Sequence, residues 1–362
     1  MNATKRTEGS TRHDTTGLLI SADSHVMEPT DLWTTLVPLP LRDQAPSFPP
    51  HKVGEGFQAH AGGWDPHERQ KEMATDGVSA EVLYPTLGLG LFALDDAPLQ
   101  EACFQVYNDW LMEYCKAAPD QLIGVAMISA YNIESAVQEL ERCAQGGLRG
   151  CLVWQTPHPD LPFTSGHYDP LWAAAESLRM PVSLHILTGH GYSKKQFELI
   201  RAGVRIQGVD HYRNSVNTKQ FEAANAVLDL VFSGVMERFP ELKFVIVENE
   251  VGWLPFMVQQ WDYYYRRFSA RNPMPLSMEP GAYVQRQVYA TFFKDAVGGH
   301  LISRWGQDNY MWSNDFPHEN STWPHSREVI AQTLGHLPPD AMAKVLHQNV
   351  TNLYGLDFSG AA

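Results

Sequence analysis

Residues 18–29 read LLISADSHVMEP, in which an apolar run ends in three ionisable side chains, Asp23, His25 and Glu28. Similar short runs rich in β-branched residues recur along the chain and alternate with longer segments of helical period. Eight runs are predicted as strands: 18–23, 80–85, 122–128, 150–155, 181–186, 243–248, 288–293 and 309–315. Eight strands that alternate with helices in one chain predict an α/β fold, the (β/α)8 TIM barrel.

The connections after the first and fifth predicted strands are longer than the others and are predicted to be insertions over the catalytic face. The first is rich in Pro and Gly between Pro38 and Pro66, and the second contains the helical stretch 217–240. Residues 1–17 have no apolar core typical of a secretion signal and are predicted to be a disordered N-terminal tail. Residues 18–362 are predicted to form a single domain.

The composition argues against two classes of partner. The 41 acidic and 27 basic residues give a formal charge of -14, which disfavours nucleic acid and anionic membrane surfaces. No apolar run approaches the roughly 20 residues needed to span a bilayer. The four cysteines have no C-x-x-C spacing, which indicates neither a disulfide framework nor a zinc knuckle. We therefore expect a cytoplasmic protein.

Metal-ligand residue types stand at the ends of four predicted strands. They are Asp23 and His25 on the first strand, His185 on the fifth, Glu248 on the sixth, and Asp315, followed by His318, on the eighth. In a TIM barrel these carboxyl ends meet at one face, where the active site lies. Carboxylates and neutral imidazoles are common ligands of divalent cations, and three or more carboxylates would repel one another without a cation. The pattern predicts a divalent-metal site.

Four further residues are candidates for substrate binding. Trp154 follows the fourth strand, where loop packing is the alternative interpretation, and His190 and Tyr192 follow the fifth. Arg327 could orient a substrate carboxylate, although the surface of the following helix is an equally reasonable place for it. The aromatic stretch 261–268, WDYYYRRF, is predicted to be a helix that packs in the core or against another subunit.

Three stretches resemble signature blocks of a known family: SADSHVMEPTDLW (21–33), FPELKFVIVENEVGWLPFMVQQWD (239–262) and MWSNDFPHENSTWP (311–324). They resemble the amidohydrolase superfamily, and most closely its amidohydrolase-2 branch, which includes aminocarboxymuconate semialdehyde decarboxylase-like and dihydroxybenzoate decarboxylase-like enzymes. The resemblance extends from Leu18 to Gly355. It implies a metal-dependent barrel in which metal-ligand positions are occupied by Asp23, His25, His185 and Asp315.

The chain departs from the family pattern, and these departures are compatible with either a one-ion or a two-ion metal site. Many members carry His-x-His on strand one, where this chain has Asp23 and His25, and a His near the end of strand six, where it has Glu248. A site for one ion would use the four positions above, with Glu28 and Glu248 orienting them. A site for two ions would also use Glu28, Glu248 and His318, an oxygen-rich set suited to iron or manganese. Zinc, manganese and iron are thus the candidate metals.

The resemblance leads to three functional hypotheses. The first is a metal-dependent enzyme that decarboxylates or hydrolyses a small carboxylated substrate, with Asp315 as a proton acceptor and Glu248 or His318 as a proton shuttle. The second is a dinuclear iron or iron–manganese monooxygenase that hydroxylates an unactivated carbon. The third is a metal-stabilised scaffold subunit that partners an active paralogue. The resemblance also implies a homo-oligomer, in particular a dimer.

Overall fold

The computed structural model describes residues 17–49, 60–201, 204 and 206–358. The predicted N-terminal tail, apart from Gly17, lies outside the described residues. Part of the Pro- and Gly-rich connection, residues 50–59, also lies outside them.

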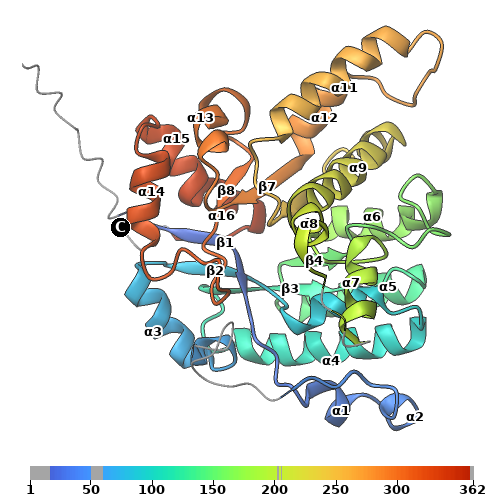
Figure 1. Ribbon diagram of the computed structural model, residues 1–362, viewed down its shortest axis with the longest axis vertical. Helices are drawn as coiled ribbons and strands as arrows, with labels where there is room; N and C mark the ends of the chain where they lie inside the picture. Colours follow the sequence, from blue (N-terminus) through green and yellow to red (C-terminus); the bar gives the residue numbers. More distant parts are fainter. Residues whose placement is uncertain (1–16, 50–59, 202–203, 205, 359–362) are drawn as a thin grey trace, which may run out of the picture.

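Eight parallel strands form one sheet in the order β1 to β8, which confirms the predicted barrel (Figure 1). The strands are β1 Ile20–His25, β2 Ala80–Tyr84, β3 Leu122–Met127, β4 Gly150–Val153, β5 Val182–His185, β6 Phe244–Val247, β7 Val288–Phe292 and β8 Tyr310–Trp312. The segment after β8 returns to β1. There the backbone N–H of His25 donates to the carbonyl of Phe316 at 2.7 Å, and that of Asp315 to the carbonyl of Asp23 at 3.1 Å. These bonds bring the two edges of the sheet together.

Helices surround the strands on the outside of the barrel (Figure 1). They are α1 Leu32–Leu36, α2 Leu39–Arg42, α3 Pro66–Asp76, α4 Ala97–Cys115, α5 Ile133–Gln145, α6 Asp169–Leu178, α7 Tyr192–Arg201, α8 Gly208–Tyr212, α9 Lys219–Phe232, α10 Val235–Arg238, α11 Leu254–Phe268, α12 Pro280–Gln287, α13 Ala296–Trp305, α14 Ser326–Leu334, α15 Pro339–Ala343 and α16 Asn349–Tyr354. Helices α11 and α12 extend away from the strands at the upper right of the figure.

Local sequence accounts for where several helices begin. The side chain of Asn132 accepts hydrogen bonds from the backbone N–H groups of Glu134 and Ser135 at the start of α5. Asp65 caps α3 in the same way, with Pro66 at the first helical position. These caps satisfy backbone donors that have no partner inside the helix.

The two predicted insertions reach the carboxyl ends of the strands. After β1 the chain forms α1, α2, the short 3-10 helix η2 (Ala61–Gly63) and α3. The carbonyl of Gly63 accepts a hydrogen bond from the N–H of Met27, just beyond β1. After β5 the chain forms α7 to α10, and Lys194 of α7 pairs with Asp95, which precedes α4. Both insertions therefore contribute to the rim of the barrel.

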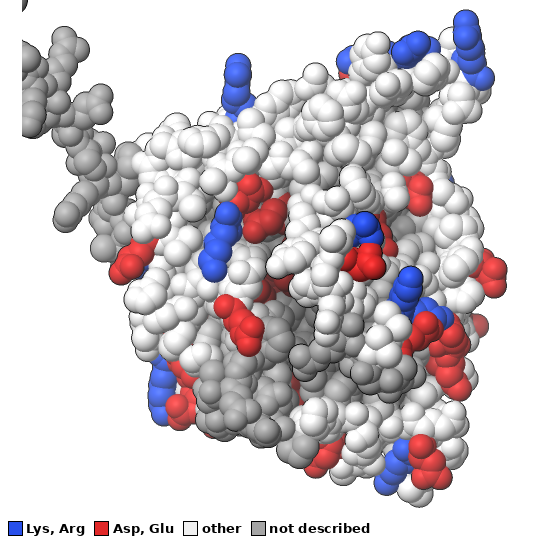
Figure 2. Space-filling model, viewed as in Figure 1, with Lys and Arg blue, Asp and Glu red and all other residues white. Residues whose placement is uncertain are grey.

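The core is apolar and contains all four cysteines, which are free and buried. Among the described residues, no helix combines the length and apolar character needed to cross a membrane. On the face seen in Figure 2, acidic side chains are spread among basic ones, and some line a recess near the middle of the view.

Candidate metal centre

The carboxyl ends of the strands bring six of the predicted ligand residues together in two overlapping groups. The first group is Asp23, His25, His185 and Glu248, and the second is His25, Glu248, Asp315 and His318. Within each group, one nitrogen or oxygen atom of every side chain lies within 4.8 Å of those of the others. Strand order explains the meeting, because β1 is a neighbour of β8 and the inner faces of β1, β5 and β6 look across the same barrel.

Two imidazoles in the first group are oriented by backbone carbonyls. Nδ1 of His25 donates to the carbonyl of Pro85 at 2.8 Å, and Nδ1 of His185 donates to the carbonyl of Ile186, also at 2.8 Å. A carbonyl can only accept, so Nδ1 carries the proton and Nε2 keeps its lone pair in the neutral ring. The two Nε2 atoms face each other at 3.4 Å. This is the arrangement in which imidazoles hold a metal ion.

The carboxylates converge on the same point. Oδ1 of Asp23 lies 3.5 Å from Nε2 of His25 and 3.8 Å from Nε2 of His185, and it accepts no hydrogen bond from any described residue. Oε2 of Glu248 lies 3.6 Å from Nε2 of His185, and Oδ1 of Asp315 lies 3.5 Å from Nε2 of His25. A buried carboxylate oxygen without a partner is costly, and a cation surrounded by these lone pairs removes that cost. The residues therefore fit a divalent cation.

Burial and mutual repulsion disfavour the charged forms of these carboxylates. Burial, followed by the nearby Asp315 carboxylate, raises the pKa of Glu248 to about 8. Burial and the Asp23 carboxylate raise the pKa of Asp315 well above its usual value. A positive ion reverses this tendency because it stabilises the ionised carboxylates.

Two of the predicted acidic ligands stand on turns rather than in strands. Glu248 and Asp315 have φ angles of 61° and 57°, in the left-handed region that residues other than glycine seldom adopt. Each follows the end of its strand, and the turn redirects the side chain towards the other ligands. Such strained positions are typical of functional sites.

Glu28 serves a neighbouring loop and belongs to neither group. Its carboxylate accepts hydrogen bonds from the N–H groups of Thr86, Leu87 and Gly88, at the start of the 3-10 helix η3 (Leu87–Ala93), at 3.3, 2.9 and 3.0 Å. Burial raises its pKa to about 7, against the opposite effect of these N–H groups. His318 touches the same loop, because its Nε2 lies 3.1 Å from Oγ1 of Thr86.

A buried ion pair between Arg69 and Glu81 supports the part of the site that lies on β1 and after β8. The sequence alone does not reveal this pair. Arg69 of α3 donates to Oε2 of Glu81 in β2 at 2.5 Å and to the carbonyl of His25 at 2.7 Å. Another of its nitrogens lies 3.5 Å from the carbonyl of Phe316. Arg69 thus holds the two segments that carry His25 and Asp315. Its position in a polar helix gives no sign of this role, since its partners are distant in sequence.

The candidate substrate-binding residues lie at two different ends of the barrel: three are at or near the rim on the carboxyl side, and Arg327 is at the amino-terminal end. His190 and Trp154 lie at the rim, with their rings in edge contact at 5.4 Å, and Nε2 of His190 is 2.9 Å from the hydroxyl of Tyr131. His190 also forms a second cluster of ligand-type side chains with Asp95 and His158. The chain places Tyr192 close by, at the start of α7, with its backbone N–H bonded to Oε1 of Glu222 at 2.8 Å.

Arg327 is not brought to the ligand cluster. Its guanidinium donates to the carbonyls of Gly77 and Gly17 at 2.6 and 3.1 Å. These glycines precede β2 and β1, so Arg327 lies at the amino-terminal end of the barrel, opposite the predicted site. Arg327 belongs to the first turn of α14, and this turn is fixed beside the end of α3, where Ser326 donates through its N–H and its hydroxyl to the carboxylate of Asp76.

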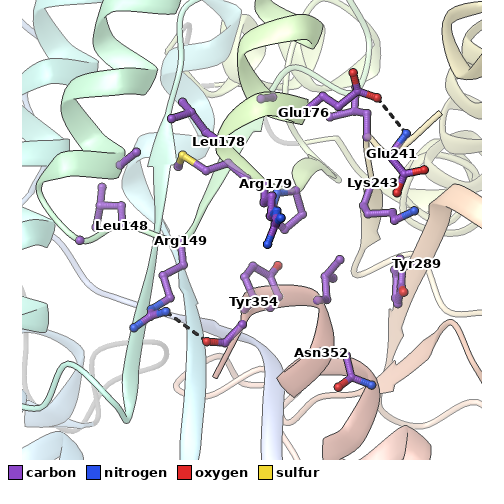
Figure 3. Close-up of a pocket in the computed structure, with 18 of the residues that line it drawn as sticks. Leu148, Arg149, Glu176, Leu178, Arg179, Glu241, Lys243, Tyr289, Asn352 and Tyr354 are labelled. Atoms are coloured by element: carbon purple, nitrogen blue, oxygen red, sulfur yellow. Dashed lines mark hydrogen bonds between the residues drawn. The ribbon is translucent and has the colours of Figure 1, made fainter. Parts of the chain in front are cut away.

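A large pocket also lies at the amino-terminal end, beside the starts of β4 to β6 (Figure 3). It has a volume of about 1010 Å³ and is bordered by charged residues that include Arg149, Glu176, Arg179, Glu241 and Lys243. None of the clustered ligand residues lines it. The predicted site therefore rests on the residue types at the carboxyl ends of the strands, where TIM barrels have their active sites, and not on this pocket.

Comparison with known proteins gives a family and a set of relatives. The Amidohydrolase family model matches residues 30–356. A gamma-resorcylate decarboxylase of Rhizobium radiobacter is 26% identical over 268 residues, which cover 70% of this chain and 76% of that protein. The family match therefore spans nearly the whole described barrel.

Solved structures agree with the fold. The 5-carboxyvanillate decarboxylase of Sphingomonas paucimobilis has a TM-score of 0.71 and 21% identity, with 94% of this chain and 99% of that chain covered. A dihydroxybenzoic acid decarboxylase of a Polaromonas species, with bound manganese and the inhibitor 2-nitroresorcinol, has a TM-score of 0.68 and 19% identity, with 94% and 97% covered. Because the family model covers far more than half of the sequence, this chain belongs to the amidohydrolase family, in its amidohydrolase-2 branch.

Proposed function

We propose that this protein is a divalent-metal-dependent decarboxylase that acts on a small carboxylated aromatic compound. The observation that carries the proposal is the convergence of imidazole lone pairs and the partnerless Oδ1 of Asp23 on one buried point. The names of the relatives support the reaction class, since those compared above are decarboxylases of hydroxylated benzoates. The manganese in the Polaromonas enzyme supports a divalent metal.

The reaction requires one carbon–carbon bond to break. The electron pair of that bond stays on the ring carbon as carbon dioxide leaves, and the carbon then takes up a proton. A divalent ion at this site would act as a Lewis acid that polarises a substrate oxygen and stabilises the negative charge. Asp23, His25, His185 and Asp315 would hold the ion.

Glu248 and His318 are the residues we assign to proton transfer, together with Asp315. The side chains of Glu248 and His318 are 15% and 11% exposed, whereas the other members of the two groups are almost completely buried. They therefore face the side from which a substrate can approach. Nδ1 of His318 lies 2.9 Å from Oδ1 of Asp315, close enough to pass a proton between them.

A second candidate function is that of a dinuclear oxygenase. It is favoured by the two overlapping groups, each of which offers four ligand-type side chains and shares His25 and Glu248 with the other. Six such residues exceed the four ligands of a tetrahedral ion such as zinc. Two iron or manganese ions would supply the redox chemistry that dioxygen activation requires.

Metal counting and gas exchange separate the candidates. Elemental analysis of protein purified with and without air should give one ion per chain for the decarboxylase, with carbon dioxide released from hydroxybenzoates in the absence of oxygen. Two irons, or iron and manganese, with substrate-dependent oxygen uptake would replace this proposal by the oxygenase. Activity only after addition of a co-purified paralogue would instead indicate the scaffold subunit. Protein without bound metal under any condition would contradict all three.

We also propose that the protein is a homodimer that associates through α11. This helix exposes Phe256, Tyr264 and Phe268, with 62%, 48% and 44% of their surfaces accessible. Tyr264 and Phe268 are four residues apart and their rings stack on the helix surface, while Phe256 is exposed two turns earlier in the same helix. Light scattering should show a dimer for the wild type and a monomer for Tyr264→Asp, and a monomeric wild type at micromolar concentration would contradict this assignment.

A further inference from the structure

Thr291 of β7 links two of the proposed metal ligands through its hydroxyl group. Its Oγ1 lies 2.9 Å from the backbone nitrogen of Glu248 and 3.4 Å from Oδ2 of Asp23. The side chain is completely buried, and β7 stands beside β6 in the sheet. One hydroxyl thus connects the strand-one acid with the turn after strand six.

The direction of both hydrogen bonds follows from the chemistry of the partners. The N–H of Glu248 can only donate, so Oγ1 of Thr291 accepts there. Its own hydrogen is then available for Oδ2 of Asp23, which as a carboxylate oxygen accepts. This bond engages one oxygen of Asp23 and leaves Oδ1 without a partner among the described residues, 3.5 Å from Nε2 of His25.

The same hydroxyl anchors the turn that presents Glu248. The backbone of Glu248 is in the left-handed region, with φ of 61°, and its Oε2 lies 3.6 Å from Nε2 of His185. A left-handed residue other than glycine needs surrounding contacts to hold it. The hydrogen bond to Thr291 is such a contact, and it acts on the N–H of the strained residue itself.

We infer that Thr291 is a positioning residue that orients Asp23 and Glu248 towards the divalent cation. The inference rests on the proposed metal site and adds a residue to it. Thr291 does not need to touch the ion, because a hydrogen bond to a ligand fixes which oxygen faces the metal and lowers the cost of arranging the site. Loss of such an outer contact typically weakens metal binding by about 10- to 100-fold.

Metal affinity tests this role directly. The dissociation constant for Mn²⁺ alone is measured by competition with a chromophoric chelator for the wild type and three variants. Thr291→Val keeps the shape and removes the hydroxyl, and we expect a rise of about 10- to 100-fold. Thr291→Ser keeps the hydroxyl and should bind close to wild type. Thr322→Val is a control, since it removes a buried hydroxyl whose partner is Ser326, which bonds to Asp76 of α3 and to no predicted ligand.

The outcomes distinguish the inference from the proposal beneath it. A wild type that binds neither Mn²⁺ nor Zn²⁺ nor Fe²⁺ would overturn both. Tight binding by wild type and Thr291→Val alike would overturn only the role of Thr291. Equal weakening in Thr291→Ser and Thr291→Val would also overturn it, because packing of the methyl group would then be responsible. If Thr291→Val does not fold, Thr291→Ala and Thr291→Ser differ by one oxygen and must show the same contrast.

Discussion

The two ends of the barrel treat ionisable residues in opposite ways. At the carboxyl end, acids and imidazoles are buried and crowded, and Asp23 even retains an oxygen without a partner. At the amino end, Arg149 and Lys243 border a pocket and donate to backbone carbonyls, while Arg179 is exposed (Figure 3). The difference lies in burial rather than in the number of charges. Among the described residues, the buried charges at the carboxyl end are the ones that a bound cation would compensate, whereas water can solvate the exposed charges at the amino end.

The largest expected effect follows from removal of a buried ligand at the carboxyl end. His185→Ala should lose bound metal and all activity, because Nε2 of His185 faces both Asp23 and Glu248. The fold should remain, as strand-end residues contribute more to chemistry than to the core. Elemental analysis, an activity assay and circular dichroism measure the three quantities. Full metal occupancy in this variant would show that the ion, if present, lies elsewhere.

The next effect concerns stability on the same side of the barrel. Arg69→Met should lower the free energy of unfolding by about 3–5 kcal/mol, because the Glu81 carboxylate is left buried without its cation. Chemical denaturation measures the change, and the double variant with Glu81→Gln should recover part of it. Lys71→Met, on the exposed side of the same helix, is the control and should change little. Equal effects of Arg69→Met and Lys71→Met would remove the contrast between buried and exposed charges.

Glu248→Gln distinguishes a one-ion site from a two-ion site at the carboxyl end of the barrel. The amide keeps the size of the side chain and loses its charge. With one ion per chain, the metal content should stay at one while activity falls by about 100-fold through lost proton transfer. With two ions in the wild type, one should be lost and the other retained. Metal counts of one in both proteins would exclude the dinuclear oxygenase.

The smallest effect is expected at the amino end. Arg179 ends α6 with φ of 54°, a conformation that glycine adopts without strain. Arg179→Gly should therefore leave metal binding unchanged and stabilise the fold by no more than about 1 kcal/mol. Chemical denaturation and metal titration measure the two quantities. A loss of metal affinity would mean that the two ends of the barrel are coupled.

Local sequence was sufficient to predict the strands. Each strand overlaps its predicted run, although β1 extends to His25 and β8 stops at Trp312, before Asp315. These differences arise because the ends depend on pairing between strands, which a run of β-branched residues does not report. The cap at Asn132 was predictable because it involves residues only two and three positions away.

The meeting of the ligand residues was also predictable, because a barrel places the carboxyl ends of all its strands at one face. Glu28 was the exception among the predicted ligands, since its carboxylate is engaged by the N–H groups of a loop nearly sixty positions away. The structure places Arg327 at the amino-terminal end of the barrel, away from the clustered ligand-type residues. The sequence did not predict this, because the position of α14 is set by tertiary packing. The ligand roles themselves stay predictions.

The sequence alone determined the barrel, through the alternation of apolar strands and helices, and it indicated a divalent-metal site through the residue types at the strand ends. Tertiary structure alone decided how the ligands are held. Arg69 of α3 reaches the carbonyls of His25 and Phe316, and Thr291 of β7 reaches Asp23 on β1 and Glu248 just after β6. The physical reason is that periodicity and caps act over a few residues, whereas a hydrogen bond needs only proximity in space and can join residues at any separation along the chain.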